Sequence, residues 1–135
     1  MKIIKLIPVL LFVALSACDS GSDRKTTLDG HWKLVNVHGG VAGSDYNFEP
    51  GLIMWDFDAA SNTVEVTNNN TNSDLEDMLP SGTYTYSIQE NTTTPQLCEE
   101  NFFIDEVNFG CYNLGSSQLT FGQVEADGYV IKLIR

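Results

Sequence analysis

The sequence predicts an all-β domain, built as a small antiparallel up-and-down β-barrel of about seven or eight strands. From Leu28 onward apolar residues recur with a period of two, which is typical of half-buried strands rather than helices. Clusters of Gly, Asn, Asp and Pro interrupt these runs at short intervals, and no segment carries a sustained helical stripe. A β-sandwich fits the same pattern, but a barrel is preferred because closure removes exposed strand edges.

The clearest strands alternate residue by residue. The run 53–57 places Trp55 and Phe57 on one face, and a polar turn at 58–62 joins it to a second alternating run at 63–67. A hairpin is therefore predicted across this turn. Further strands are predicted at 30–37, 83–88, 101–108, 117–123 and 128–134.

The N-terminal segment is a secretory signal that ends at a cysteine. Two lysines precede an apolar run at 6–15, which is shorter than the roughly 20 residues of a membrane-spanning helix. Small residues follow, and the letters LSAC that end at Cys18 resemble the lipobox of bacterial lipoproteins. The resemblance implies that residues 1–17 are removed and that Cys18 is lipidated. The alternative is a plain secreted protein with a chance cysteine.

This interpretation divides the chain into three parts. Residues 1–17 form the signal peptide, 18–27 the lipidated cysteine with a flexible polar tether, and 28–135 a single barrel domain. The expected location is the bacterial cell envelope, where Cys18 anchors the domain to a membrane, on the periplasmic face or at the cell surface.

The charge of the mature chain limits its partners. Seven basic residues stand against eighteen acidic ones, and loss of Lys2 and Lys5 with the signal peptide leaves a net charge of −13. Nucleic acid and anionic headgroups are repelled by such a field, so binding to either is not expected. A basic envelope protein or cations would be attracted. The alternative interpretation is that the charge only keeps a tethered domain soluble.

The two remaining cysteines predict a disulfide. Once Cys18 is lipidated, Cys98 and Cys111 are left as a pair outside the reducing cytoplasm, where such pairs oxidise. A metal or redox thiol pair is the competing interpretation, but the chain has no Cys-x-x-Cys spacing and no histidine close to either residue in sequence.

The start of the first predicted strand resembles the lipocalin and lipocalin-like barrels. The letters LDGHWKL at 28–34 match the Gly-x-Trp opening of that family, and small lipocalin-like lipoproteins of Gram-negative bacteria likewise begin with a lipobox and a polar tether. The resemblance implies that Trp32 plugs one end of the barrel and that Arg135, at the end of the last strand, packs against it. The helix and further motifs of lipocalins proper are absent from the sequence.

The resemblance also raises the question of a ligand. A barrel of this size either fills its lumen with side chains or holds one small molecule. For a small apolar ligand, the loop 38–51 would act as a lid over the mouth, and aromatic side chains would line the cavity. The candidates for that lining are Tyr46, Phe48, Trp55, Phe57, Tyr84 and Tyr86.

Other polar groups in the sequence do not have the pattern of a binding or catalytic site. Asp56 and Asp58 lie about 6.6 Å apart on one strand face, but alternation places them on the solvent side. Oxygen-bearing residues at alternate positions of 68–76 lack the glycine and closing acid of a calcium loop. His31 and His38 are seven residues apart and are expected on opposite strand faces. No metal, cofactor or catalytic constellation is predicted, and the chain is not expected to be an enzyme.

Two functions therefore remain open. One is a lipid-anchored lipocalin-like lipoprotein that binds a small apolar molecule in its barrel. The other is a filled barrel that acts through its acidic surface, as an envelope scaffold or as an inhibitor-like lipoprotein that binds a basic protein. The volume of the lumen separates the two, because only the first needs an open cavity.

Overall fold

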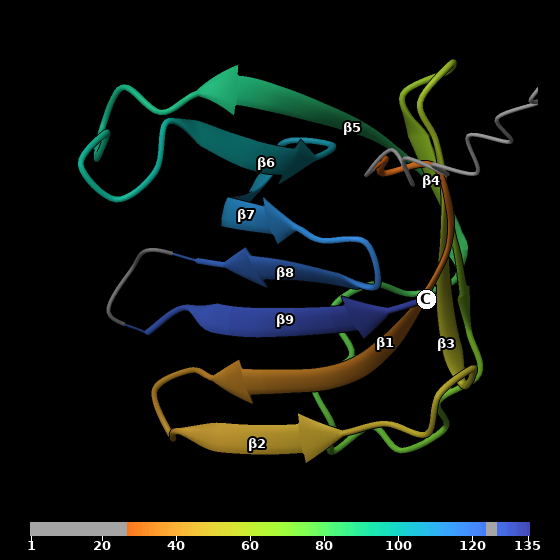
Figure 1. Cartoon of the computed structure of the whole chain (residues 1–135). Helices are drawn as coiled ribbons and strands as arrows, with labels where there is room; N and C mark the ends of the chain where they lie inside the picture. The colour runs from red at the N-terminus through yellow and green to blue at the C-terminus, as the bar shows by residue number, and fades with distance from the viewer. Residues whose placement is uncertain (1–26, 124–126) are drawn as a thin grey trace, which may run out of the picture.

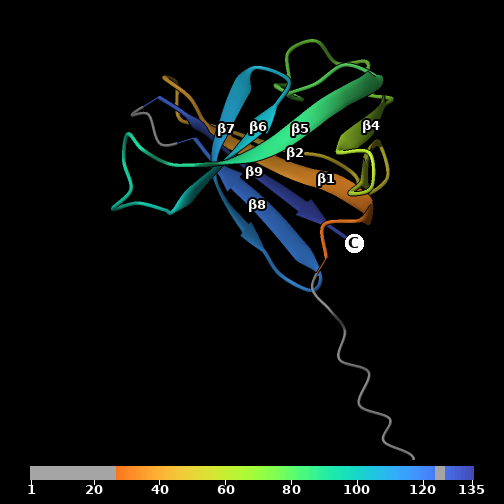
Figure 2. The same ribbon diagram turned by 90° about the horizontal axis from the view of Figure 1, so that it is seen from above.

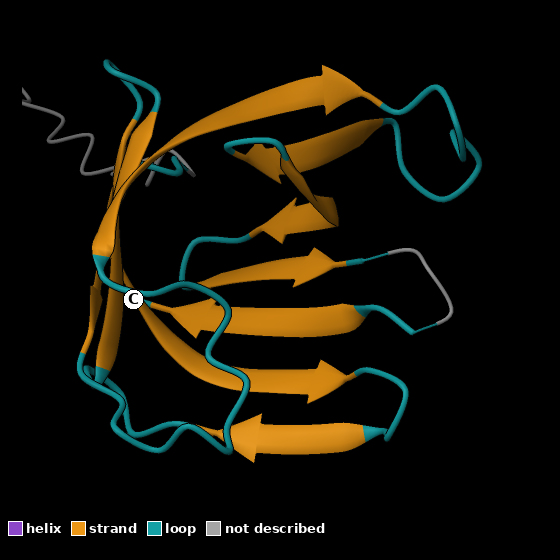
Figure 3. Ribbon diagram, turned by 180° about the vertical axis from the view of Figure 1, so that it is seen from behind, coloured by secondary structure: helices purple, strands orange, loops and turns teal. Residues whose placement is uncertain are grey.

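The computed structural model describes residues 27–123 and 127–135, and every regular element within them is a strand (Figure 3). The predicted signal peptide, Cys18 and all of the predicted tether before Thr27 lie outside the described residues. The strands are β1 (Gly30–Gly39), β2 (Ser44–Asn47), β3 (Ile53–Asp58), β4 (Thr63–Asn68), β5 (Gly82–Glu90), β6 (Glu100–Ile104), β7 (Val107–Leu114), β8 (Gln118–Gly122) and β9 (Tyr129–Ile134).

The strands form a closed antiparallel barrel of eight strands with one extra strand (Figures 1 and 2). From β3 to β9 each strand pairs with the next along the chain, and β1 closes the barrel by pairing with both β3 and β9. The extra strand β2 pairs with residues 36–39 of β1, on the same edge of β1 that pairs with β3 through residues 30–33. The predicted all-β, up-and-down barrel is confirmed.

The hairpin between β3 and β4 has the predicted bounds. Along β3, buried side chains alternate with partly exposed ones, and Trp55 and Phe57 point inward. The turn is held by the carboxylate of Asp58, which accepts hydrogen bonds from the backbone N–H of Ala60 at 2.9 Å and of Ser61 at 3.4 Å. Asn62 takes a positive φ of 54°, a conformation that asparagine adopts more readily than most residues.

Two segments differ from their predictions. The run 101–108 is not one strand, because a turn at Asp105 divides it into β6 and β7. The segment 38–51 is not an open lid, because its middle forms β2 and pairs with the second half of β1. The β1–β2 connection is reduced to a turn at residues 40–43.

β7 pairs with β6 and with β8, and it bends where the β6–β7 register shifts. Its first part, residues 107–111, pairs with β6, and its last part, residues 111–114, pairs with β8. At the bend, Gly110 has a φ of +81°, and a Cβ there would lie 2.1 Å from the carbonyl oxygen of Gly122. Only glycine fits this corner without moving the backbone.

The lumen of the barrel is occupied by side chains from all sides. Trp55 is fully buried. Its ring centroid lies 6.0–6.3 Å from the ring centroids of Phe57, Phe109 and Phe121. Phe102 lies 4.8 Å from Phe121 in the same cluster. Such aromatic arrangements add to the free energy of burial, so the cluster contributes to the stability of the barrel. The remaining fully buried large residues are Trp32, Leu34, Val37, Ile53, Ile104, Leu119, Ile131 and Leu133.

One end of the barrel is closed by the first and last described segments. The indole N–H of Trp32 donates to the carbonyl oxygen of Leu28 at 2.8 Å, and the guanidinium carbon of Arg135 lies 4.3 Å from the Trp32 ring centroid. The opposite end carries the β1–β2 turn, the β5–β6 loop, the end of β8 and the start of β9, which lie together at the left of Figure 1. We call this second end the mouth.

Candidate functional site

The residues predicted to line an apolar cavity fall into two groups. Trp55, Phe57 and Tyr86 belong to the buried cluster, with exposed fractions of 0%, 4% and 8%. Tyr86 stacks on Phe102 at 5.3 Å and meets Phe57 edge to face at 5.5 Å. These rings therefore contact one another across the lumen.

The other three lie toward the periphery of the core. Tyr84 is half-buried, and its hydroxyl donates to the carbonyl oxygen of Pro80 at 2.9 Å. Tyr46 is half-buried on β2, and Phe48 is buried just after it, with its backbone N–H donating to the carbonyl of Val35. The aromatic residues after β2 thus pack against the core.

One polar atom inside the cluster has no partner. The indole Nε1 of Trp55 is buried and makes no hydrogen bond within the described part of the chain. A buried donor without an acceptor costs about 1–3 kcal/mol, and its nearest rings, from Phe57, Phe109 and Phe121, offer only weak π contacts. The lumen therefore contains one site where a polar acceptor would be stabilised.

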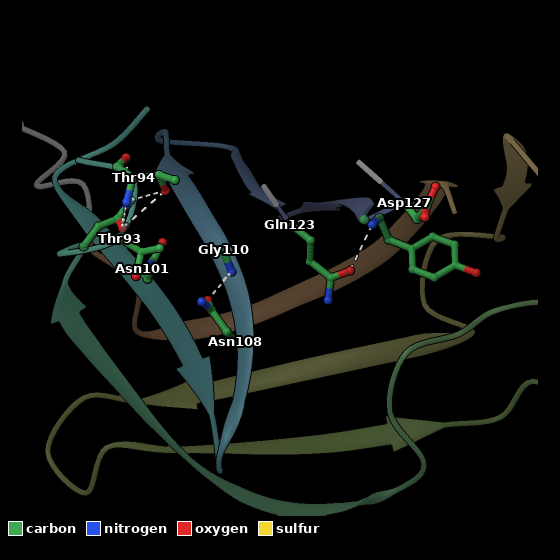
Figure 4. Close-up of a pocket in the computed structure, with 10 residues that line it drawn as sticks. Thr93, Thr94, Asn101, Asn108, Gly110, Gln123 and Asp127 are labelled. Carbon is green, nitrogen blue, oxygen red and sulfur yellow. Dashed lines mark hydrogen bonds between the residues drawn. The ribbon is translucent and has the colours of Figure 1, made fainter. Parts of the chain in front are cut away.

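A cavity of about 410 Å³ opens at the mouth instead (Figure 4). In the close-up, Thr93, Thr94 and Asn101 lie on one side, Gln123 and Asp127 on the other, and Asn108 and Gly110 between them. Asn91, Gly128 and Tyr129 complete the lining, which includes none of the six predicted cavity residues. Most of its side chains carry an amide or a hydroxyl group, while apolar atoms contribute as much of its surface as polar ones, so the cavity is suited to ligands that have both kinds of group.

The loop between β5 and β6 is fixed at the mouth by a buried amide and by the disulfide. Asn91 is 2% exposed; its Nδ2 donates to the carbonyl oxygens of Thr94 and Cys98, and its Oδ1 accepts from the Thr94 N–H. The predicted Cys98–Cys111 disulfide is confirmed and ties the end of this loop to the bend of β7. The cavity wall is therefore held at both ends of the loop.

A second hollow, of about 450 Å³, lies beside Cys98. Glu99, Glu100 and Tyr112 line it, and Glu90 faces Glu100 directly across the β5–β6 ladder. Like charges directly opposite each other on paired strands repel. The Tyr112 hydroxyl stabilises the Glu100 carboxylate by donating a hydrogen bond to it at 3.1 Å. Burial, then the hydrogen bond and charge of Glu100, raises the pKa of Tyr112. We call Glu90, Glu99 and Glu100 the acidic hollow.

The aspartates of β3 lie on the outer face, as predicted. Asp56 is partly exposed and Asp58 exposed, while their neighbours Trp55 and Phe57 are buried. The Ser61 side chain first, and then the backbone N–H groups of Ala60 and Ser61, lower the pKa of Asp58 below 3.8. Burial, with smaller effects of Asp29 and Asp58, raises the pKa of Tyr86 on the inner side.

The prediction for the two histidines is wrong. A register shift between Leu34 and Asn36 in the β1–β9 pairing adds one residue, so His31 and His38 are both exposed. His31 Nδ1 contacts the carboxylate of Asp56, and His38 Nδ1 pairs with Asn36 Oδ1 at 2.8 Å. Each ring has its own partner. No cluster of three metal-ligating side chains occurs in residues 27–123 and 127–135.

Alternate asparagines after β4 cap one another's backbone. The side-chain oxygens of Asn68, Asn70 and Asn72 each accept the backbone N–H two residues on, at 2.9–3.1 Å. These successive turns explain the alternation of oxygen-bearing residues without a bound ion. The segment is a structural coil over the barrel.

The sequence did not single out the residues of the mouth cavity. Asn101 and Asn108 come from the paired strands β6 and β7, and Gln123 follows β8, which pairs with β7, so the three are brought together by the pairing of successive strands. The available signal was the amide and hydroxyl residues that cluster at strand ends, where loops replace the apolar alternation.

No family model, curated protein or solved structure matches this chain. In the described parts, 27–123 and 127–135, no helix is long and apolar enough to cross a membrane.

Proposed function

We propose that this chain is a lipid-anchored lipoprotein of the bacterial cell envelope, and that its filled barrel acts through its surface by binding a basic envelope protein. The lipid anchor is Cys18, reached through the LSAC sequence and the tether up to residue 27. The barrel is a rigid platform held near the membrane.

The filled lumen is the observation that carries this proposal. Trp55, Phe102, Phe109 and Phe121 are at most 1% exposed and form one contiguous aromatic cluster between the sheet walls. A ligand of ordinary size needs roughly 300 Å³, and space for it would require these rings to move apart. A close-packed interior resists such movement because each displaced ring loses many contacts.

The acidic hollow supports a basic partner. Glu90 and Glu100 are exposed and face each other across the β5–β6 ladder, and Glu99 adds a third exposed carboxylate beside the 450 Å³ hollow. A lysine or arginine inserted there would relieve the repulsion between the carboxylates. The net charge of −13 adds long-range attraction that accelerates encounter.

The anchor is tested by metabolic labelling. Cells that express the full chain are grown with a radiolabelled fatty acid, and Cys18→Ser is the control. Label on the wild-type protein alone supports the anchor, whereas equal labelling of both, or of neither, contradicts it.

The partner is tested by cross-linking in the native envelope, with Glu99→Gln compared with Glu49→Gln. Both substitutions remove one exposed negative charge, but Glu49 lies between β2 and β3, away from the acidic hollow. The proposal predicts one basic partner whose cross-link weakens with salt and with Glu99→Gln alone. Equal effects of the two variants, or a partner indifferent to salt, would contradict it.

A small apolar ligand in the lumen is the second candidate. It is favoured by one observation, the unpaired indole N–H of Trp55, which could donate to a polar group on such a ligand. This candidate requires the aromatic cluster to open. Organic extraction of the protein purified from its own host tests it, since a retained ligand would be recovered in stoichiometric amount.

A further inference from the structure

The mouth cavity has no role in the proposed function. We propose that it binds a neutral, hydroxyl-rich small molecule of the saccharide class. The inference is independent of the lipid anchor and of any protein partner, because the mouth cavity and the hollow beside Cys98 share no lining residue.

The charges of the lining disfavour an anionic ligand. None of the described lining residues is a lysine, arginine or histidine, and Asp127 is their one carboxylate. An anionic ligand would therefore lose water without gaining a counter-charge. An apolar ligand would cover amides and hydroxyls without pairing them, which costs free energy for each group. A ligand rich in hydroxyls satisfies both donors and acceptors.

Two amides are held in fixed orientations. Gln123 Oε1 accepts the backbone N–H of Tyr129 at 2.9 Å, and Asn108 Oδ1 accepts that of Gly110 at 2.7 Å. Because each oxygen is engaged, each NH2 group is left to donate to a ligand. Figure 4 shows both side chains with these bonds drawn. Donors fixed before binding lose little conformational entropy when a ligand arrives.

The aromatic ring of Tyr129 is also fixed. It packs so closely on the β1–β2 turn that a Cβ at Gly40 would lie 2.9 Å from the Tyr129 ring, and the Gly40 N–H donates to the carbonyl of Gly128. Tyr129 is also among the residues that line the cavity, so its aromatic carbons add apolar surface beside the amide and hydroxyl groups. A pyranose ring presents C–H groups as well as hydroxyls, and such a mixed lining suits both.

The opposite wall is rigid as well. Thr93 and Thr94 belong to the loop that Asn91 and the Cys98–Cys111 disulfide hold in place. Both residues line the cavity, and the Thr94 hydroxyl is held by the Asn91 amide, which donates to it at 3.1 Å. A volume of about 410 Å³ is within the range of about 300–1,000 Å³ usual for small-molecule sites.

The test follows the side-chain NH2 resonances of the full, host-processed chain in detergent by NMR. The probes are maltose and N,N′-diacetylchitobiose, which are both neutral, and inorganic phosphate as a charged comparison. We expect at least one saccharide to shift the NH2 resonances of Asn101, Asn108 and Gln123 in a saturable way. Phosphate should leave them unchanged.

Two alanine variants separate the cavity from the rest of the surface. Asn101→Ala should weaken the saccharide about tenfold, the effect of losing roughly 1.4 kcal/mol of interaction. Asn113→Ala should bind as the wild type, because Asn113 is exposed on β7 and lines the acidic hollow instead. The dispersion of backbone resonances establishes that both variants are folded.

Three results would overturn the inference. One is the absence of a saturable shift with either saccharide in the folded wild-type protein. Another is a shift that Asn101→Ala leaves unchanged. The third is a stronger response to phosphate than to either saccharide.

Discussion

Arg135 lies over the indole ring of Trp32, with its guanidinium carbon 4.3 Å from the ring centroid. Its Nη2 also donates to the carbonyl oxygens of Thr27 and, at 2.9 Å, of Asp29, while Trp32 Nε1 donates to Leu28. The last residue of the chain therefore joins the segment before β1 to the end of the barrel. This contact adds to the β1–β9 pairing that closes the sheet.

The two tryptophans should respond differently to the same substitution. Trp32→Phe loses the hydrogen bond to Leu28 and weakens the contact with Arg135, whereas Trp55→Phe removes a buried donor that has no partner. Both residues are fully buried, so the loss of volume is matched. We expect Trp32→Phe to lower the free energy of unfolding by roughly 1–3 kcal/mol more than Trp55→Phe does.

Urea unfolding under non-reducing conditions measures this difference. Equal costs for the two variants would show that the barrel-end contacts contribute nothing to stability. A larger cost for Trp55→Phe would indicate that its N–H has an acceptor, and would favour the luminal ligand.

The disulfide should contribute substantially to stability. Cys98 and Cys111 are 13 residues apart, and a loop of this length is worth about 3 kcal/mol in the chain-entropy model. The double variant Cys98→Ser, Cys111→Ser should lose this amount in urea unfolding, and reductant should then have no further effect on it. An unchanged free energy of unfolding would contradict the prediction.

Any side chain at Gly110, in the bend of β7, should destabilise the fold. Alanine there would need a φ of +81° and would place its Cβ 2.1 Å from the Gly122 carbonyl oxygen. We expect Gly110→Ala to lower the free energy of unfolding by at least about 2 kcal/mol.

Gly122→Ala is the matched control. Its Cβ would meet no atom within 4 Å, and its backbone lies directly opposite the same corner. A change below about 1 kcal/mol is expected in the same unfolding assay. Similar costs for both variants would mean that the corner is not sterically tight.

The β3–β4 turn should depend on pH through Asp58. Its pKa is lowered chiefly by the Ser61 side chain, so the ionised form is favoured in the folded protein. The stability that Asp58 contributes is therefore present above pH 3.8 and is lost as the pH falls through its lower folded pKa. Ser61→Ala should return the pKa toward 3.8.

An NMR titration of the Asp58 carboxyl carbon measures this shift. Thr63, whose hydroxyl lies 2.7 Å from that of Ser61, offers the control Thr63→Val, which keeps Ser61 itself. A pKa of Asp58 that Ser61→Ala leaves unaltered would contradict the assigned cause.

The fold was predictable wherever a strand alternates and its turn has local signals. The β3–β4 hairpin is the clearest case, since Asp58 and Asn62 stabilise the turn within their own segment. The β6–β7 turn was missed because its support is distant. The carboxylate of Asp105 accepts from the N–H and hydroxyl of Thr85 on another strand, which no local pattern reveals.

Two further differences have tertiary causes. The register shift near Val35 turns His38 to the same side as His31, and it arises in the pairing with β9 rather than in the sequence around it. β2 has four residues of mainly polar character, and it is a strand only because β1 extends beyond β3. The mouth cavity is assembled from distant segments, so neither its position nor its polar lining followed from alternation.

Native mass spectrometry tests most directly whether the lumen is filled. The sample is the full chain, purified from its own host's envelope without reductant. We predict the mass of the lipidated chain from Cys18 to Arg135, two hydrogens light for the Cys98–Cys111 disulfide, with no apolar molecule retained. A stoichiometric apolar adduct that organic solvent releases would contradict the account, because the aromatic cluster around Trp55 leaves it no room.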